Sequence, residues 1–319
     1  MAEFHLPVLL KQVLELLDLK PGQVVIDGTV GGAGHAGHML KAVMPGGFLL
    51  GLDRDPQVAE LAVRELLSAG FTREEQFDVE VRRFSQFDEA LASRRISGFD
   101  RMLLDLGVNS LHLDSAVRGF SIKRDGPLDM RMNPQDAGSR SAAEVVESYD
   151  EAALARIFDK YGEERFAKRV ASAIVKARSV EPIRTTARLR EVVAQAIPRR
   201  AWPAHIDPAT KVFQALRIEV NAELDELDSV LERLPEYVLP GGRVGIISFH
   251  SLEDRRVKEA FRSWSRGCIC PSDFPVCVCH RKAEFRVVTN RAVVGDEEEI
   301  ADNPRARSAK LRVVERIAS

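Results

Sequence analysis

The sequence predicts an α/β protein with a Rossmann-like, mostly parallel sheet of seven strands and an inserted helical domain. Short apolar runs alternate with helical segments over residues 23–107, which is typical of a parallel sheet covered by helices. A glycine-rich loop follows the first run, as in nucleotide-binding folds. The fourth predicted strand ends at 107 and the fifth starts at 242. Because one crossover unit needs about 30 residues, this gap indicates an insertion.

The predicted elements follow in chain order. Leucines at helical spacing predict a first helix over 5–19, and the glycine loop leads into a second helix that ends near 44. Three further helices are expected, at 56–69, 208–234 and 252–264. Apolar runs predict seven strands, the last two forming an antiparallel hairpin: 23–30, 47–53, 78–84, 99–107, 242–250, 283–290 and 310–317.

The inserted domain is predicted to span 118–207, and 1–117 with 208–319 form the main domain. The central part of the insert, 140–198, is rich in Ala, Glu, Arg, Lys and Leu at helical spacing. Between 118 and 215 there are 18 Lys and Arg against 13 Asp and Glu, a net charge of +5, whereas the whole chain carries −2. A protein that bound nucleic acid by bulk charge alone would be strongly basic. The insert is therefore the expected local basic surface.

Composition predicts a soluble, cytoplasmic protein. Apolar residues make up 45% of the 319 residues, enough for a packed core, but no run approaches the roughly 18 apolar residues of a membrane span. The first residues lack the basic leader and apolar stretch of a signal peptide. All four cysteines lie between 268 and 279, which argues against a disulfide scaffold.

The glycine loop raises the question of its ligand. Gly32, Gly34 and Gly37 spell GxGxxG, and Asp53 ends the next apolar run, nearly the pattern of a dinucleotide site. However, Asp27 ends the strand before the loop, where a carboxylate suits an ammonium group better than a phosphate. S-adenosylmethionine, with its ammonium and sulfonium, is the preferred cofactor. NAD and a loop with tight turns alone are the alternatives, since a ribose-binding acid such as Asp53 suits either cofactor.

Polar residues after the fourth and fifth strands are candidates for the acceptor side. Asp105 and Asn109 leave the edge of the sheet where such folds bind ligands, and they could grip an exocyclic amine. A helix cap is the alternative for Asn109. At the end of the third strand, Phe84 could stack on adenine or belong to the core. His250, after the fifth strand, could contact substrate or be structural.

Two loops complete the candidates. Residues 118–132, with mixed charges and a Gly-Pro turn, are expected to form an ordered loop at the site, where Arg118, Asp129 and Arg131 would bind substrate. Cys268, Cys270, Cys277 and Cys279 could bind zinc, but CxC is less common in zinc sites than CxxC. Thiols without a metal are the preferred interpretation, so no metal ligand is predicted.

Long motifs then resemble one family across nearly the whole chain. They occur in this order: HLPVLL, DGTVGGAGH, LDRDP, LLDLGV, RGFSIKRDGPLDMRM, YGEERFAKRVASAI, PATKVFQALRIEVNAEL, LPGGRVGIISFHSLEDRRVK and NPRARSAKLRVVER. The chain resembles the ribosomal RNA small subunit methyltransferase H family, also called RsmH or MraW. This resemblance implies a class I methyltransferase with a helical insert for substrate recognition. It also implies methyl transfer from S-adenosylmethionine to N4 of one cytidine, position 1402, in 16S rRNA of the small ribosomal subunit.

The resemblance also implies site residues. Carried over by motif, the donor would be held by Ala33, Gly34, His35, Asp53, Phe84, Asp105 and His112. This chain has Ala33 where the family usually has Gly, and His112 where it usually has Gln. It also has Asp207 and Lys211 where the family usually has His and Arg.

The expected reaction is direct attack of the cytosine N4 on the methyl group, with Asp105 orienting the amine and no covalent enzyme intermediate. Basic side chains of the insert would hold phosphate or simply form a solvated helix face: Lys168, Arg169, Lys176, Arg178, Arg188 and Arg190. A methyltransferase of the same fold for another RNA, a protein or a small molecule is the alternative function. A ribosome-assembly factor without catalytic activity is a further one.

Overall fold

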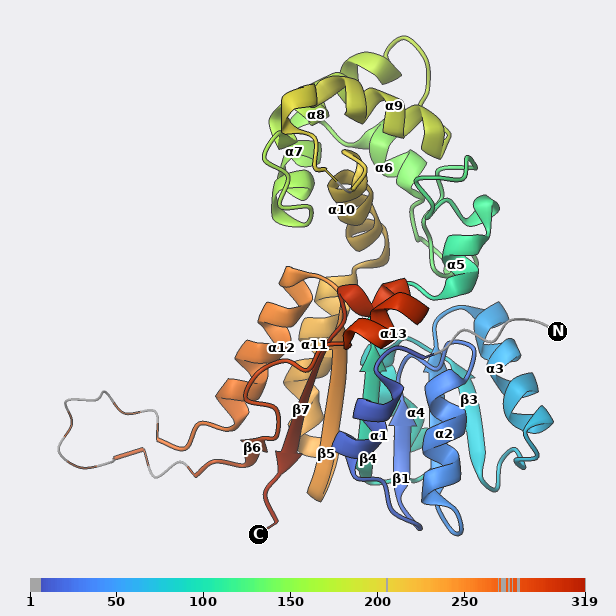
Figure 1. Ribbon diagram of the computed structural model, residues 1–319, viewed down its shortest axis with the longest axis vertical. Helices are drawn as coiled ribbons and strands as arrows, with labels where there is room; N and C mark the ends of the chain where they lie inside the picture. Colours follow the sequence, from blue (N-terminus) through green and yellow to red (C-terminus); the bar gives the residue numbers. More distant parts are fainter. Residues whose placement is uncertain are drawn as a thin grey trace. The chain divides into compact units, whose positions relative to one another are not determined.

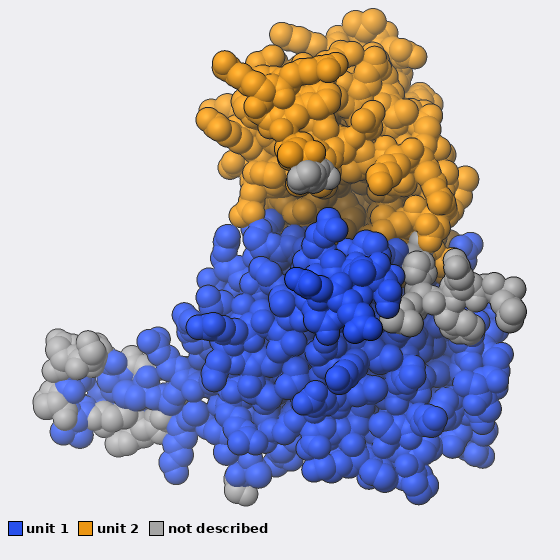
Figure 2. All heavy atoms as spheres, viewed as in Figure 1, with its two compact units in different colours: residues 1–107, 225–319 blue, residues 108–224 orange. Residues whose placement is uncertain are grey.

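The structure is a computed structural model that describes residues 7–204, 206–268, 270, 274, 276, 278–279 and 282–318, except the side chain of Ser110. The chain divides into two compact units, which Figure 2 shows in different colours. The first unit comprises Met1–Gly107 and Asp225–Ser319, and the second comprises Val108–Leu224. The second unit contains the predicted insert 118–207 and extends beyond it at both ends.

The first unit is built on a seven-stranded sheet in the order β3-β2-β1-β4-β5-β7-β6 (Figure 1). Strands β1 to β5 are parallel, and β7 runs antiparallel to both β5 and β6. The strands are β1 Val24–Asp27, β2 Phe48–Asp53, β3 Phe77–Val81, β4 Phe99–Asp105, β5 Val238–Ser248, β6 Phe285–Val287 and β7 Lys310–Arg316. The chain order reverses between β1 and β4, and ligands in such sheets bind at that point, beyond the carboxyl ends of the strands.

Helices bury both faces of this sheet. Successive residues of a strand point to opposite faces, so Val25 of β1 joins one apolar cluster and Ile26 joins the other. One cluster packs against α1 Leu10–Leu17, α2 Gly34–Val43 and α3 Pro56–Ser68; the other packs against α4 Phe87–Ser93, α11 Glu223–Tyr237 and α12 Ser251–Trp264. A short helix, α13 Glu297–Asp302, precedes β7.

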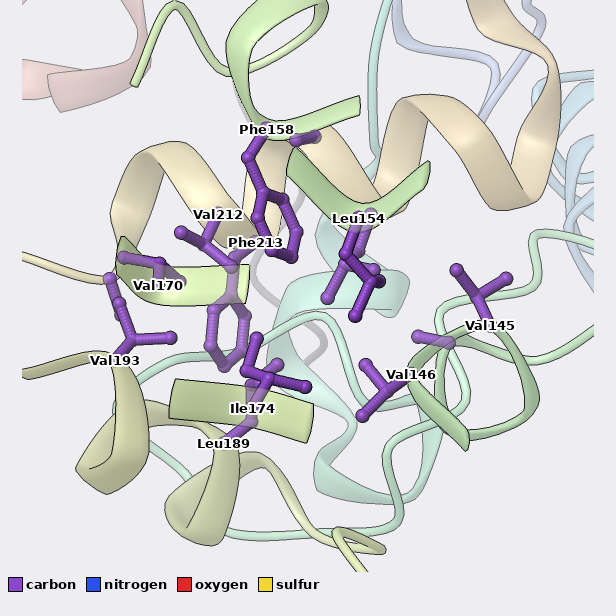
Figure 3. Packing of buried hydrophobic residues seen from close by; sticks show 14 of the residues in the cluster. Val145, Val146, Leu154, Phe158, Val170, Ile174, Leu189, Val193, Val212 and Phe213 are labelled. Atoms are coloured by element: carbon purple, nitrogen blue, oxygen red, sulfur yellow. The ribbon is translucent and has the colours of Figure 1, made fainter. Parts of the chain in front are cut away.

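The second unit is helical and has its own core. Figure 3 shows its packing, in which Phe158, Ile174, Leu189 and Phe213 come from four different helices. Burying each such side chain contributes about 2 kcal/mol. The helices are α5 Ser110–Asp114, α6 Ala142–Ser148, α7 Glu151–Lys160, α8 Ala167–Arg178, α9 Thr186–Ala196 and α10 Thr210–Asn221.

The structure confirms the predicted α/β class and all seven strands, and it corrects one helix. The predicted helix over 208–234 is two helices, α10 and α11, because Ala222 between them has a left-handed backbone with φ 51°. The core of the second unit includes Val212 and Phe213 of α10, and this unit extends to Leu224. Among the described residues, no helix combines the length and apolar character needed to cross a membrane.

Candidate active site

Three carboxylates end three adjacent parallel strands of the first unit. Asp27 closes β1, Asp53 closes β2 and Asp105 closes β4. In the register of the sheet, Asp27 lies opposite Gly51 of β2 and Leu103 of β4. These are the strands on either side of β1, so the carboxyl groups lie at one edge of the sheet, at the point where the chain order reverses.

Asp27 is almost fully buried, with 1% of its surface exposed. Its Oδ1 accepts a hydrogen bond from the backbone N–H of Thr29, at 3.2 Å. Its Oδ2 is enclosed and has no hydrogen-bond partner among the described residues. Burial raises the pKa of this carboxyl group to about 7, the Thr29 hydrogen bond opposes the shift and the charge of Asp53 adds to it. A cation placed beside Oδ2 would offset the cost of this buried charge.

Asp105 is the second unsatisfied carboxylate. Its backbone N–H donates to the hydroxyl oxygen of Thr29 at 2.6 Å, which ties the end of β4 to the glycine loop. Its Oδ1 is enclosed without a partner among the described residues, although 26% of the side chain as a whole is exposed. Burial raises the pKa of Asp105 to about 8; the charge of Asp27 raises it further and that of Arg305 lowers it.

Asp53 differs because both of its oxygens accept hydrogen bonds from the backbone. The N–H of Gly31 donates to Oδ2 at 3.2 Å, and the N–H of Asp55 donates to Oδ1 at 2.9 Å. Burial still raises the pKa of Asp53, to about 6, with these hydrogen bonds opposing the shift. A carboxylate held in this way has lone pairs left to accept hydrogen bonds from two hydroxyl groups.

The glycine loop between β1 and α2 packs closely on the sheet. A Cβ atom at Gly28 would lie 2.4 Å from Cδ2 of Leu104 and 3.2 Å from Cβ of Phe84, so the Leu104 side chain would have to shift to admit one. Gly31 and Ala33 have left-handed backbones, with φ 55° and 63°. A left-handed Ala is strained, which explains why glycine is the usual residue for such a position.

His35 enters the site from the first turn of α2. Its Nε2 pairs with the carbonyl oxygen of Val8 at 2.9 Å, and since a carbonyl only accepts, Nε2 carries the proton. Burial lowers the pKa of His35 to about 4, so the ring is neutral at physiological pH. Its Nδ1 lies 3.8 Å from Oδ2 of Asp105, too far for a hydrogen bond.

Phe84 follows β3 and starts a short 3-10 helix, Phe84–Gln86. Its neighbours are anchored to α11, because both Arg83 and the Ser85 hydroxyl donate to the carboxylate of Glu226. Phe84 is partly exposed, and its Cβ lies against Gly28 at the start of the glycine loop. Phe84 thus lies just beyond the end of β3, next to the start of the glycine loop.

Five predicted site residues belong to the second unit: Asn109, His112, Arg118, Asp129 and Arg131. Asn109 caps α5, with its side-chain oxygen accepting from the N–H of His112 at 2.9 Å. This hydrogen bond is the helix cap that the sequence offered as an alternative. His112 is 3% exposed and stacks on Phe120, with ring centroids 5.0 Å apart.

The predicted substrate loop of this unit is held by its own charged side chains. Arg131 donates to both oxygens of Asp129, at 2.9 and 2.8 Å, which lowers the pKa of that carboxyl group against the opposing effect of burial. Arg118 donates to the carbonyl oxygens of Arg131 and Met132, at 3.1 and 2.8 Å. These contacts make 118–132 an ordered loop.

His250 is placed in the first unit, as the residue that caps α12. Its Nδ1 accepts from the N–H of Glu253 at 3.3 Å, and the Glu253 carboxylate accepts from the N–H of His250 at 3.3 Å. This reciprocal pair satisfies the free N–H groups at the start of the helix. His250 therefore has a structural function that the sequence also allowed.

Two contributors to the site were not predicted from the sequence. Thr29 binds both Asp27 and Asp105, and the Val8 carbonyl orients His35. Thr29 carried a usable signal, because it lies two residues after the strand-ending Asp27. The contact to Val8 joins residues 27 positions apart, and no local pattern indicates it.

Comparison with known proteins decides the family. The MraW methylase family matches residues 2–317. The chain belongs to the MraW methylase family. Its members are methylases, which confirms the prediction of S-adenosylmethionine as cofactor and of a class I methyltransferase fold.

Curated relatives of this MraW chain carry the name ribosomal RNA small subunit methyltransferase H. The protein from Geobacter sulfurreducens is 50% identical over 313 residues, covering 98% of this chain and 99% of the relative. The protein from Syntrophotalea carbinolica is 49% identical, covering 98% of each chain. That from Geotalea uraniireducens is 45% identical over 318 residues, covering 99% of this chain and 100% of the relative.

Proposed function

We propose that this protein methylates the N4 amine of cytidine 1402 in 16S rRNA of the small ribosomal subunit. The observation that carries the reaction type is the pair of enclosed carboxylate oxygens, Asp27 Oδ2 and Asp105 Oδ1, at the switch point of the sheet. The names of the curated relatives support small-subunit rRNA as the substrate. The choice of N4 and of position 1402 rests on the family resemblance of the motifs.

The residues at the strand ends fit S-adenosylmethionine. Its ammonium and sulfonium groups are cationic, and Asp27 and Asp105 are buried acids whose enclosed oxygens call for a positive partner. Asp53 would accept hydrogen bonds from the ribose hydroxyls, and Phe84 would stack on the adenine. Ala33, Gly34 and His35 would line the donor from the start of α2. When bound, the cofactor supplies an electrophilic methyl group.

The chain's own residues would position the acceptor. The carboxylate of Asp105 would accept a hydrogen bond from the N4 amine and direct the nitrogen lone pair toward the methyl group. Once N4 had received the methyl group it would be positively charged, and it would then release a proton to water. A carboxylate at this position stabilises that charge. Because His35 is neutral, it does not compete with the substrate for the negative charge of Asp105.

The second unit offers a basic helix face for RNA. This unit has 19 Lys and Arg against 16 Asp and Glu, a net of +3, while the rest of the chain carries −5 (−2 minus +3). Lys168, Arg169 and Lys176 are exposed on α8, and their spacing places them on one face. The other three predicted phosphate ligands have protein partners, since Arg178 donates to the carbonyl of Val146, Arg188 pairs with Glu191 and Arg190 pairs with Asp207. We assign phosphate contacts to the α8 face.

Nucleoside analysis tests this function. The purified protein is incubated with S-adenosylmethionine and either unmodified small subunits or naked 16S rRNA, and the digested RNA is examined for N4-methylcytidine by mass spectrometry. The modified nucleoside is expected, and it should disappear when cytidine 1402 is replaced by uridine. Methylation of a different nucleoside would refute the assignment. So would the absence of any methylation by a protein that still binds the donor. The second result would point to another substrate or to a non-catalytic assembly factor.

A further inference from the structure

Among the described residues of the segment between α12 and β6, none belongs to an apolar cluster. Its two ends are fixed, because the rings of Trp264 and Phe285 pack with centroids 5.2 Å apart. Between them, the large apolar residues that the structure describes are exposed: Phe274 by 49%, Val276 by 70% and Val278 by 62%. In small folds without a sufficient core, crosslinks or metal ions supply the missing stability.

Three thiols in this segment converge. The Sγ atoms of Cys268, Cys270 and Cys279 all lie within 4.8 Å of one another, and those of Cys268 and Cys279 are 3.8 Å apart. A disulfide requires about 2.05 Å. Ligands around a tetrahedral zinc ion with Zn–S bonds of about 2.3 Å are separated by about 3.8 Å. The observed separation matches two ligands of one ion and exceeds a covalent bond.

The backbone around the thiols supports negative charge on sulfur. The N–H of Cys270 donates to Sγ of Cys268 at 3.4 Å, and the N–H of Val278 donates to Sγ of Cys270 at 3.4 Å. Hydrogen bonds of this kind orient metal-binding ligands and stabilise their anionic form. Two of the three sulfur atoms therefore already have an outer shell suited to a bound cation.

We propose that Cys268, Cys270 and Cys279 bind one structural Zn²⁺ ion, which closes the loop between α12 and β6. Thiolates prefer a soft or borderline ion such as Zn²⁺ over Mg²⁺ or Ca²⁺. This site goes beyond the proposed methyl transfer, to which none of these cysteines contributes. The sequence alone favoured thiols without metal because CxC is uncommon, whereas the separation of the sulfur atoms points to an ion. The fourth cysteine, Cys277, lies outside the described residues.

Metal analysis of the full-length protein tests the proposal. Protein purified without chelator is expected to contain about one zinc per chain by inductively coupled plasma mass spectrometry. Cys268→Ser, Cys270→Ser and Cys279→Ser should each lose most of this zinc. Phe274→Ala, in the same segment but without a thiol, should retain it. Circular dichroism and binding of S-adenosylhomocysteine should be unchanged in all variants, which separates this test from that of the methylase site.

A second measurement reports on the thiols directly. Replacement of zinc by Co²⁺ should produce thiolate-to-cobalt charge-transfer absorption together with the intense visible bands of a tetrahedral site. A thiol reagent should react slowly until a chelator is added. Absence of zinc after equilibration with ZnCl₂, retention of zinc by the serine variants, or iron-dependent absorption in the purified protein would overturn the proposal.

Discussion

Oδ2 of Asp105 lies 3.8 Å from Nδ1 of His35, yet the two side chains do not form an ion pair. His35 is neutral because burial lowers its pKa to about 4 and its other nitrogen donates to the Val8 carbonyl. Asp105 therefore gains no positive charge from His35, and burial together with the charge of Asp27 raises the pKa of its carboxyl group to about 8. This arrangement supports the proposed binding of a cationic group at the site.

Replacing Asp105 tests its function in orienting the acceptor. Asp105→Ala should lower turnover of rRNA methylation by about 10²-fold or more, because a misplaced reacting group costs a factor of this size. Asp105→Asn keeps one acceptor oxygen and should lose less. Single-turnover rates and circular dichroism are the measurements. A folded Asp105→Ala variant with unchanged turnover would exclude this function.

The raised pKa values predict how stability depends on pH. In the folded protein the pKa of Asp27 is about 7 and that of Asp105 about 8, against an ordinary value of 3.8. The folded state therefore binds more protons than the unfolded state between these values. The contribution of these two carboxyl groups to the free energy of unfolding is fully present below about pH 4. It is lost as the pH rises through 7 to 8.

Thermal unfolding of the unliganded protein should accordingly show Tm falling from pH 6 to pH 8. Each group contributes up to about 1.4 kcal/mol per pH unit. Asp27→Asn removes one buried charge, so it should raise Tm at pH 8, flatten the pH dependence and weaken donor binding. Asp159→Asn, at an exposed site, is the control and should do none of these. A Tm that rises with pH in the wild type, with no change in Asp27→Asn, would contradict the burial argument.

The basic face of α8 predicts a change in salt dependence. Replacing Lys168, Arg169 and Lys176 by Ala should weaken rRNA binding and reduce the slope of log K against log salt by about 2 to 3, because each phosphate contact contributes about one. The matched control replaces Arg188 and Arg190, which are paired with Glu191 and Asp207. Equal slopes for both variants in a filter-binding titration would show that RNA does not bind at this face.

The glycine loop predicts a pair of variants with different outcomes. Gly28→Ala should destabilise the protein by about 1–3 kcal/mol, because the added Cβ would clash with Leu104. Gly32→Ala should be well tolerated, since the nearest atom to its Cβ, from Leu61, lies at 3.9 Å. Chemical denaturation measures both. Similar stabilities for the two variants would mean that β4 yields and that Gly28 is not required by packing.

Much of the first unit could be predicted because its rules are local. Alternation of apolar runs with helical segments indicated the parallel strands, and acidic residues at the ends of β1, β2 and β4 indicated the edge proposed for the site. The prediction of one helix over 208–234 was wrong, because the break at Ala222 does not follow from a local sequence rule. Ala222 has a residue type that favours helix, so its left-handed backbone is not indicated by the local sequence.

The sequence by itself determined the class of fold and the family, and it indicated the edge of the sheet that we propose as the site. Tertiary structure alone decided which oxygens of Asp27 and Asp105 are enclosed, that His35 is neutral, and that Asn109 caps a helix. Strand periodicity and strand-end residues are properties of neighbouring positions in the chain. Burial, pKa and the approach of Val8 to His35 depend on groups far apart in sequence, so folding had to bring those groups together.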